Sequence, residues 1–239
     1  MKEELLKPAR RSAREQIARL ADAGSFREIN AVLPSVDPLH FPEYRQKLKA
    51  AQERSGELEG VLTGRAAVQQ CPCMLIAMEP AFLMGTMGSV VGEKIVRAFE
   101  AAARRRYPVV SLAASGGARM QEGVYALMQM AKTAAAVYQH GRRGLLYISV
   151  ISDPTLGGVS ASFASLGDVV LALKGARYGF TGRRLVEETT HEQLPEDFQT
   201  ADYCLWHGQV DMVVEEERLR DTVGRLLRLH QRKRRFGCL

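Results

Sequence analysis

VVSLAASGGARMQEG, residues 109–123, is the stretch that decides the fold. It begins with a nearly continuous apolar run over 109–114, the pattern of a strand covered on both faces of a sheet. Gly116 and Gly117 follow, and because glycine tolerates torsions that a side chain forbids, main-chain N–H groups there can point into open space. Spacings of three and four then predict a helix, a pattern typical of one face packed on a core. Its apolar stripe is Met120, Val124, Leu127, Met128, Ala131 and Ala135.

A second stretch repeats this arrangement. LLYISVI (145–151) is another candidate for a buried strand, and DPTLGG (153–158) leads into a helix of small residues. Gly117 and Gly158 are 41 residues apart, about the length of one strand-and-helix crossover unit. Exposed N–H groups at the start of a helix favour a negative oxygen. Two such turns on neighbouring strands therefore predict an oxyanion hole with a donor from each turn.

Five segments, in the same order along the chain, resemble the β subunit of the bacterial multi-subunit acetyl-CoA carboxylase carboxyltransferase. They are MGTMGSVVGEKIVRAFEAA (84–102), SGGARMQEG (115–123), LMQMAKTAAA (127–136), YISVISDPTLGGVSASFASLGD (147–168) and GQVDMVV (208–214). Several segments in a fixed order are more specific than a lone short motif. The resemblance covers roughly residues 12–214.

The resemblance implies an α/β fold of the crotonase-like type, a spiral of strand-strand-helix units, with N-terminal and C-terminal helical extensions. It also implies an activity: transfer of a carboxyl group from carboxybiotin on a biotin carboxyl carrier protein to acetyl-CoA, which gives malonyl-CoA. The cofactor is then biotin carried on a partner protein, and a coenzyme A thioester is the substrate. The implied partner is a carboxyltransferase α subunit in an α2β2 assembly, and both subunits contribute glycine N–H groups.

Carried onto this sequence, the resemblance places the catalytic positions in the two glycine turns, at Gly117 and Ala118 in the first and at Gly157 and Gly158 in the second. Gly117 or Ala118 and Gly158 are the predicted N–H donors, and Gly157 shapes the second turn. The predicted substrate-binding positions are Ser115, Gly116 and Arg119. A helix cap is the structural alternative for the serine, and a surface charge is the alternative for the arginine.

The sequence contains no GxSxG elbow, no HExxH motif and no P-loop. A site without an obvious nucleophile or base fits a reaction that needs mainly placed N–H donors and a dry, oriented pocket. In the family's mechanism the ureido nitrogen of biotin takes the methyl proton of the substrate.

Composition and charge fit this prediction. The chain has 239 residues, of which 46% are hydrophobic and 25% charged, as is ordinary for a globular protein. No apolar run approaches the ~18 residues of a membrane span, and the N-terminal segment lacks the apolar stretch of a signal peptide. We therefore expect a cytoplasmic protein with no membrane partner. The net charge of +6 suits the phosphates of coenzyme A, although a solvated basic surface also explains it, and we expect no nucleic-acid partner.

We divide the chain into three parts. Residues 1–55 form a predicted N-terminal helical arm, residues 56–214 the carboxyltransferase core, and residues 215–239 a basic amphipathic helix. In the arm, two serines, each followed three residues later by a glutamate, have capping-box spacing and predict helix starts at Ser12 and Ser25. The core begins with a predicted hairpin up to residue 79.

The cysteines do not predict a metal site. Cys71 and Cys73 have a spacing that invites zinc, but a structural zinc site needs four ligands, and Cys204 and Cys238 do not form a second close pair. The β subunits of the family usually carry a four-cysteine zinc ribbon ahead of the helical arm, where this sequence begins. We therefore expect no zinc in this chain.

Two alternatives remain open. The chain departs from the family where Arg183 replaces a usual proline and where residues 173–174 replace a usual Glu-Pro pair. These changes keep open a biotin-independent decarboxylase or another crotonase-like acyl-CoA enzyme. A non-catalytic basic scaffold or nucleic-acid-binding regulator is the other alternative, but a scaffold has no need of two aimed glycine turns.

Overall fold

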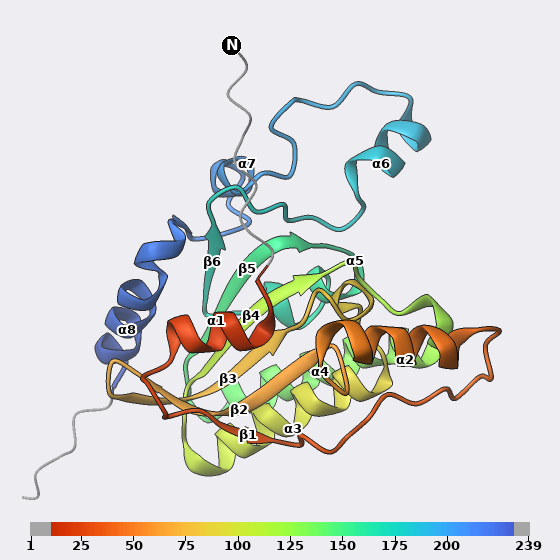
Figure 1. Ribbon diagram of the computed structural model, residues 1–239. Coiled ribbons are helices and arrows are strands. Elements are labelled where there is room, and N and C mark those ends of the chain that lie inside the picture. Colours follow the sequence, from red (N-terminus) through yellow and green to blue (C-terminus); the bar gives the residue numbers. More distant parts are fainter. Residues whose placement is uncertain (1–10, 232–239) are drawn as a thin grey trace, which may run out of the picture.

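A seven-stranded sheet forms the centre of the computed structural model, which describes residues 11–231 (Figure 1). The strands follow one another across the sheet in chain order. They are β1 (Arg27–Ile29), β2 (Val61–Val68), β3 (Cys71–Met78), β4 (Val109–Ser115), β5 (Tyr147–Thr155), β6 (Val169–Leu173) and β7 (Met212–Val214). The first two pairings are antiparallel and the others are parallel. The predicted α/β class and the hairpin are both confirmed.

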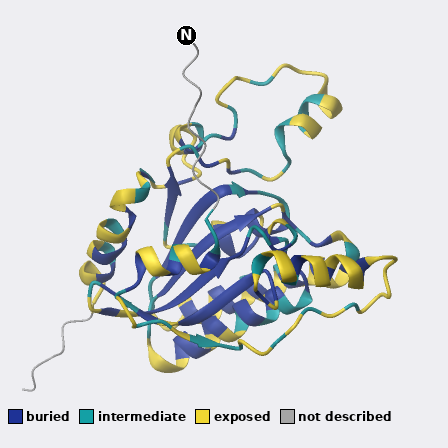
Figure 2. Cartoon of the chain, viewed as in Figure 1, coloured by how far each residue is buried: buried dark blue, intermediate teal, exposed yellow. Residues whose placement is uncertain are grey.

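Helices lie on both faces of this sheet (Figure 1). The helices of the described residues are α1 (Ala13–Leu20), α2 (Tyr44–Ser55), α3 (Ser89–Arg105), α4 (Gly123–Gly141), α5 (Gly157–Ser160), α6 (Arg183–Thr190), α7 (Ala201–Trp206) and α8 (Leu219–Leu229). Helix α6 has no buried residue and projects away from the sheet (Figure 1). The central strands are buried on both sides (Figure 2), as their near-continuous apolar sequences predict. Within residues 11–231, no helix has the length and apolar character to cross a membrane.

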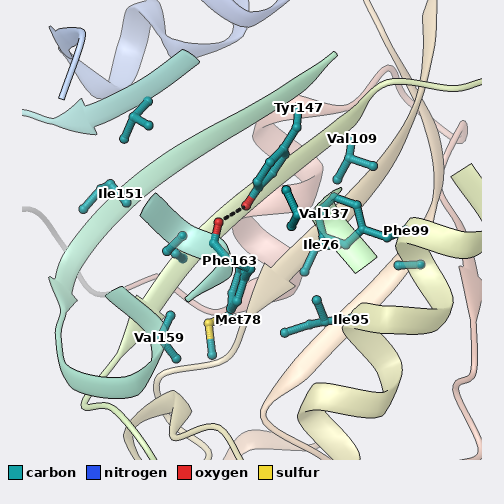
Figure 3. Close-up of a cluster of buried hydrophobic side chains, with 14 of the residues drawn as sticks. Ile76, Met78, Ile95, Phe99, Val109, Val137, Tyr147, Ile151, Val159 and Phe163 are labelled. Carbon is teal, nitrogen blue, oxygen red and sulfur yellow. Dashed lines mark hydrogen bonds between the residues drawn. The ribbon is translucent and has the colours of Figure 1, made fainter. Parts of the chain in front are cut away.

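The larger core lies between the sheet and the helices α3 and α4 (Figure 3). Phe99 of α3 meets Tyr147 of β5 edge to face, with ring centroids 5.0 Å apart, a favoured aromatic geometry. The Tyr147 hydroxyl donates to the carbonyl of Phe163 at 3.0 Å, so its polar end is satisfied inside the core. This core lies against the starts of β4 and β5, where Val109 pairs with Tyr147.

The second core lies on the other face, under α1 and α8. The predicted capping box of α1 is confirmed, because Glu15 N–H donates to Ser12 Oγ at 3.2 Å and Ser12 N–H donates to the Glu15 carboxylate at 2.8 Å. Val223 and Leu227 of α8 are buried against the sheet, as expected for an amphipathic helix. The basic end of the predicted C-terminal helix, residues 232–239, lies outside the described residues.

The second helix start predicted in the arm is wrong. Residues after Ser25 form strand β1, which pairs with β2 in the register of Arg27 opposite Arg65. Phe26 fixes this pairing, because a Cβ atom placed on Gly64 of β2 would lie 2.4 Å from its ring. Strand pairing and this close contact therefore override the local capping pattern. The arm adds a strand to the sheet, and the boundary at residue 55 stays a prediction.

The apolar stripe that predicted this helix, α4, faces outward in the structure. Met120 is 86% exposed and Leu127 is 55% exposed. The residues that face inward are Ala126, Gln129, Thr133, Ala136, Val137 and His140. A Cβ atom placed on Gly92 of α3 would lie 2.4 Å from the Gln129 side-chain oxygen. The two helices approach closely on this side, so small and polar residues occupy it.

Candidate active site

Two glycine turns meet at the carboxyl ends of β4 and β5. These strands are parallel neighbours, and their last paired residues are Ser115 and Thr155. Gly117 and Gly157 then take positive φ angles of +118° and +59°, which glycine adopts without strain. A Cβ atom placed on Gly157 would lie 3.0 Å from the Gly117 Cα. The turns are thus in contact, and a side chain at either glycine would separate them.

This contact brings together the N–H groups of Ala118 and Gly158. Neither group has a hydrogen-bond acceptor among residues 11–231. A Cβ atom placed on Gly158 would lie 3.4 Å from the Ala118 nitrogen, so the two donors are neighbours. Two adjacent N–H groups at fixed positions can stabilise one negative oxygen.

The remaining glycines of the two turns have occupied N–H groups. Gly157 N–H donates to the Phe180 carbonyl at 2.9 Å, and Gly116 N–H donates to the Met84 carbonyl at 3.0 Å. These bonds connect each turn to a neighbouring loop. Gly116 and Gly157 therefore help to shape the two turns.

Ser115 braces the first turn from inside. Its Oγ accepts a hydrogen bond from Gly117 N–H at 3.0 Å and donates to the Gly117 carbonyl at 3.3 Å. The residue is only 1% exposed. In this structure Ser115 neither faces solvent nor caps α4, which begins at Gly123. Gly117 N–H is occupied by this contact, whereas the Ala118 N–H has no acceptor among the described residues.

Arg119 lies beneath the first turn with no exposed side-chain surface. Its Nη2 and Nη1 donate to the two carboxylate oxygens of Glu59 at 2.6 and 3.1 Å. Burial disfavours the charged form, but Glu59 outweighs burial and raises the pKa of Arg119 above its ordinary value. The surface-charge alternative is therefore wrong, because the side chain is buried, and the substrate-binding role of Arg119 stays a prediction.

Three further residues surround Arg119, namely Tyr44, Glu59 and Glu122. The Tyr44 hydroxyl donates to Glu122 at 2.8 Å, and Arg119 Nη1 donates to the same hydroxyl at 3.3 Å. Burial is the main cause that raises the pKa of Tyr44 above its ordinary value. Tyr44 and Glu59 lie 75 and 60 residues before Arg119, so no local spacing could have connected them to the glycine turn.

Apolar side chains border the two donors. Met130 of α4 and Met84 approach the turns, with Met130 Sδ 3.3 Å from a Cβ placed on Gly158 and Met84 Cε 3.4 Å from one placed on Gly116. Met84 is 65% exposed. Met130 therefore borders the Gly158 donor directly, while Met84 lies beside Gly116 at the surface.

The departures from the family pattern have local structural roles. Arg183, at the start of α6, donates to the carbonyls of Leu194 and Pro195, both at 2.6 Å, and to Glu187 at 2.9 Å. It thereby holds the loop after α6 to that helix. Lys174 pairs with Glu215 at the surface, at 2.7 Å.

The described cysteines do not form a metal centre. Burial raises the pKa of Cys73 to about 12 and that of Cys204 to about 11, so both remain thiols near neutral pH. Among residues 11–231, no group of three or more histidine, cysteine or acidic side chains suits a metal ion. Cys238 lies outside this range.

Comparison with known proteins gives the family. The family described as the carboxyl transferase domain matches residues 6–223. A protein of Pelotomaculum thermopropionicum named acetyl-coenzyme A carboxylase carboxyl transferase subunit beta is 52% identical over 223 residues, which are 93% of this chain and 79% of that protein. This similarity extends over the sheet and both glycine turns.

Solved structures share the fold. The transcarboxylase 12S structure with hydrolysed methylmalonyl-coenzyme A bound matches 91% of this chain and 41% of its own, with a TM-score of 0.79 and 25% identity. The Pseudomonas malonate decarboxylase MdcD-MdcE hetero-dimer matches 92% of this chain and 86% of its own, with a TM-score of 0.72 and 27% identity. These matches confirm the predicted crotonase-like fold. The chain therefore belongs to the carboxyl transferase domain family, and its resemblance to acetyl-CoA carboxylase carboxyltransferase β subunits is confirmed.

Proposed function

We propose that this chain is the β subunit of a biotin-dependent acetyl-CoA carboxyltransferase. It moves a carboxyl group from carboxybiotin on a carrier protein to acetyl-CoA, and malonyl-CoA is the product. The observation that carries the proposal is the adjacent pair of free N–H donors on Ala118 and Gly158. The 52% identity to a named carboxyltransferase β subunit supports it independently.

The donors suit the difficult step of this reaction. Removal of a methyl proton beside the thioester places negative charge on the carbonyl oxygen. The N–H groups of Ala118 and Gly158 stabilise that enolate oxygen more than the neutral carbonyl, which lowers the barrier. Carboxybiotin, when bound, supplies the carboxyl group and, by the family resemblance, the nitrogen that takes the proton. Loss of one donor of this kind costs about 100-fold to 1000-fold in rate.

The exposed apolar face of α4 is evidence that a partner subunit binds beside this site. Met120, Val124, Leu127 and Met128 are each more than half exposed, and they begin directly after the first glycine turn. A contiguous apolar surface of this kind marks an interaction site. We assign it to the α subunit of an α2β2 assembly, which places the second set of donors near the first.

The proposed ligands and location follow from the family. Biotin is carried on a biotin carboxyl carrier protein, and the net charge of +6 suits the phosphates of coenzyme A. We propose a cytoplasmic location, with neither membrane nor nucleic acid as a partner. Zinc has no part in the proposed chemistry of this chain.

The test is consumption of malonyl-CoA by the complex of this chain with its α subunit, with and without free biocytin. Mass spectrometry identifies the products. Loss of malonyl-CoA that requires biocytin and yields carboxybiocytin is the expected result, because it is the proposed reaction run in reverse. Loss without biocytin contradicts the proposal.

That contrary result would favour a decarboxylase that does not use biotin. The specific observation behind this second candidate is the similarity to the malonate decarboxylase structure, which extends over 92% of this chain. An enolate hole serves both reactions, so the requirement for biocytin is what separates them.

A further inference from the structure

Four buried side chains form one charged cluster beneath the first glycine turn: Tyr44, Glu59, Arg119 and Glu122, here named the Arg119 cluster. Arg119 and the two glutamates have no exposed side-chain surface. Buried charges are stable only where each one is paired and hydrogen-bonded. Loss of one member therefore removes a partner from each group that it contacts.

Arg119 connects the cluster to the segment Thr86–Met87. Its Nη2 donates to the Thr86 carbonyl at 2.7 Å, and its Nε donates to Thr86 Oγ1 at 3.3 Å. Its backbone N–H donates to the Met87 carbonyl at 3.0 Å, and Met87 N–H donates to the Gly117 carbonyl at 2.8 Å. The guanidinium thus holds the segment that in turn holds the carbonyl of Gly117.

The Gly117 carbonyl and the Ala118 N–H belong to the same peptide unit. A trans peptide is planar, and its N–H points opposite to its C=O. The hydrogen bond from Met87 to the Gly117 carbonyl therefore also sets the direction of the Ala118 N–H. If this peptide plane rotated, the donor would turn away from Gly158.

The two glutamates hold the cluster in place from other parts of the chain. Glu59 also accepts hydrogen bonds from Gly60 N–H at 2.7 Å and from Ser35 Oγ at 2.6 Å. Glu122 accepts from Ser89 N–H, in the first turn of α3, at 2.6 Å. The cluster therefore ties the loop before β2, the start of α3 and the first glycine turn together.

We propose that Glu59 and Tyr44 are positioning residues for the candidate oxyanion hole. Through Arg119 and Thr86–Met87 they fix the direction of the Ala118 N–H, although neither touches the reacting atoms. This inference rests on the proposed function, since it assigns them a role in the same site. An interaction that acts only on the transition state changes kcat and leaves KM nearly unchanged.

The test uses Glu59→Gln and Tyr44→Phe in the complex of the full chain with its α subunit. Both variants keep the shape of the side chain, and Tyr44→Phe removes only a hydroxyl. For malonyl-CoA consumption with biocytin, we expect kcat to fall by about 10-fold to 100-fold in Glu59→Gln and about 3-fold to 10-fold in Tyr44→Phe. KM for malonyl-CoA stays within about twofold of the wild-type value.

Asp22→Asn is the matched control. Asp22 accepts from Gln69 and Gln70 N–H at 2.8 and 2.7 Å and pairs with Arg220 at 2.7 Å, at the opposite end of β3 from the site. The control loses a carboxylate in the same way, so its melting temperature falls while kcat does not. The proposal is overturned if Glu59→Gln and Tyr44→Phe lower only the melting temperature, as the control does, or if they raise KM and leave kcat unchanged.

The wild-type complex separates this inference from the proposed function. If the wild type consumes malonyl-CoA without biocytin, the proposed reaction is wrong, while the positioning role is still tested by kcat for that decarboxylation. If Glu59→Gln does not assemble with the α subunit, Tyr44→Phe decides alone, and its wild-type kcat would overturn the positioning role.

Discussion

Replacement of Gly158 by alanine tests the candidate oxyanion hole most directly. The φ angle of Gly158 lies outside the left-handed region, so alanine can adopt this backbone. The new methyl carbon would lie 3.3 Å from the Cβ of Ala118 and from Met130 Sδ, and 3.4 Å from the Ala118 nitrogen. It therefore occupies the space beside the Ala118 N–H, where we place the substrate oxygen.

The two effects of this methyl group differ in size. Its contacts with protein atoms are tight but require shifts of only a few tenths of an ångström, so overpacking costs about 1 kcal/mol. For a chain of this length that lowers the melting temperature by about 2–4 °C. An oxygen that cannot approach within about 2.9 Å of the Ala118 N–H loses that donor, at about 2.7–4 kcal/mol of transition-state stabilisation. We therefore expect kcat to fall by at least about 100-fold while the fold is retained.

The assay is malonyl-CoA consumption with biocytin, together with thermal unfolding of the same samples. Gly141→Ala is the control, because a Cβ atom at the end of α4 would meet no atom within 4 Å. The control should keep the wild-type rate and melting temperature. If Gly158→Ala folds and its kcat stays within a few-fold of the wild type, the assignment of these two N–H groups to the enolate oxygen is refuted.

Three further predictions follow from other parts of the structure. Gly85→Ala should lower the free energy of unfolding by more than about 2 kcal/mol, measured by urea denaturation, because φ is +63° and the new Cβ would lie 2.2 Å from the Ala114 carbonyl oxygen. Burial lowers the pKa of His140 below its ordinary value, so the unfolded chain binds more protons than the folded one as pH falls through about 6.5. The wild type should therefore lose stability between about pH 7 and pH 5, and a variant without this histidine should lose less over the same range. Leu127→Asp or Met128→Asp on the outer face of α4 should change the stability of the isolated chain by no more than about 0.5 kcal/mol yet prevent assembly with the α subunit, as measured by size-exclusion chromatography; an intact complex would contradict the assigned interface.

The glycine turns could be predicted from the sequence because their determinants are local. An apolar run, two glycines and a helical pattern follow one another directly within residues 109–135, and the same elements recur around Gly158. The choice among the donors could not be predicted. Whether Gly117 or Ala118 presents a free N–H depends on the Ser115 hydroxyl and on Met87, and only the folded chain shows that these groups occupy the neighbouring positions.

The orientation of α4 shows a limit of periodicity. Spacing identifies an apolar stripe but does not say whether the stripe meets the core of its own chain or the surface of another. Its outward-facing stripe has the spacing of a core stripe, and the inward-facing contact of Gln129 with Gly92 involves no apolar residue that a sequence pattern could reveal. The burial of Arg119 could not be predicted for a related reason, because its partner Glu59 is distant in sequence.

Strand β1 has a consequence for association between copies of the chain. It is only three residues long, yet it covers part of the outer edge of β2, which would otherwise present eight residues of unpaired backbone. An exposed edge of that length is a template for strand addition from another molecule. The exposed Arg27 lies on the new outermost strand, and a short edge that bears a charge resists such pairing. The arm thus protects the sheet from edge-to-edge aggregation with other molecules. This role is independent of the chemistry at the glycine turns.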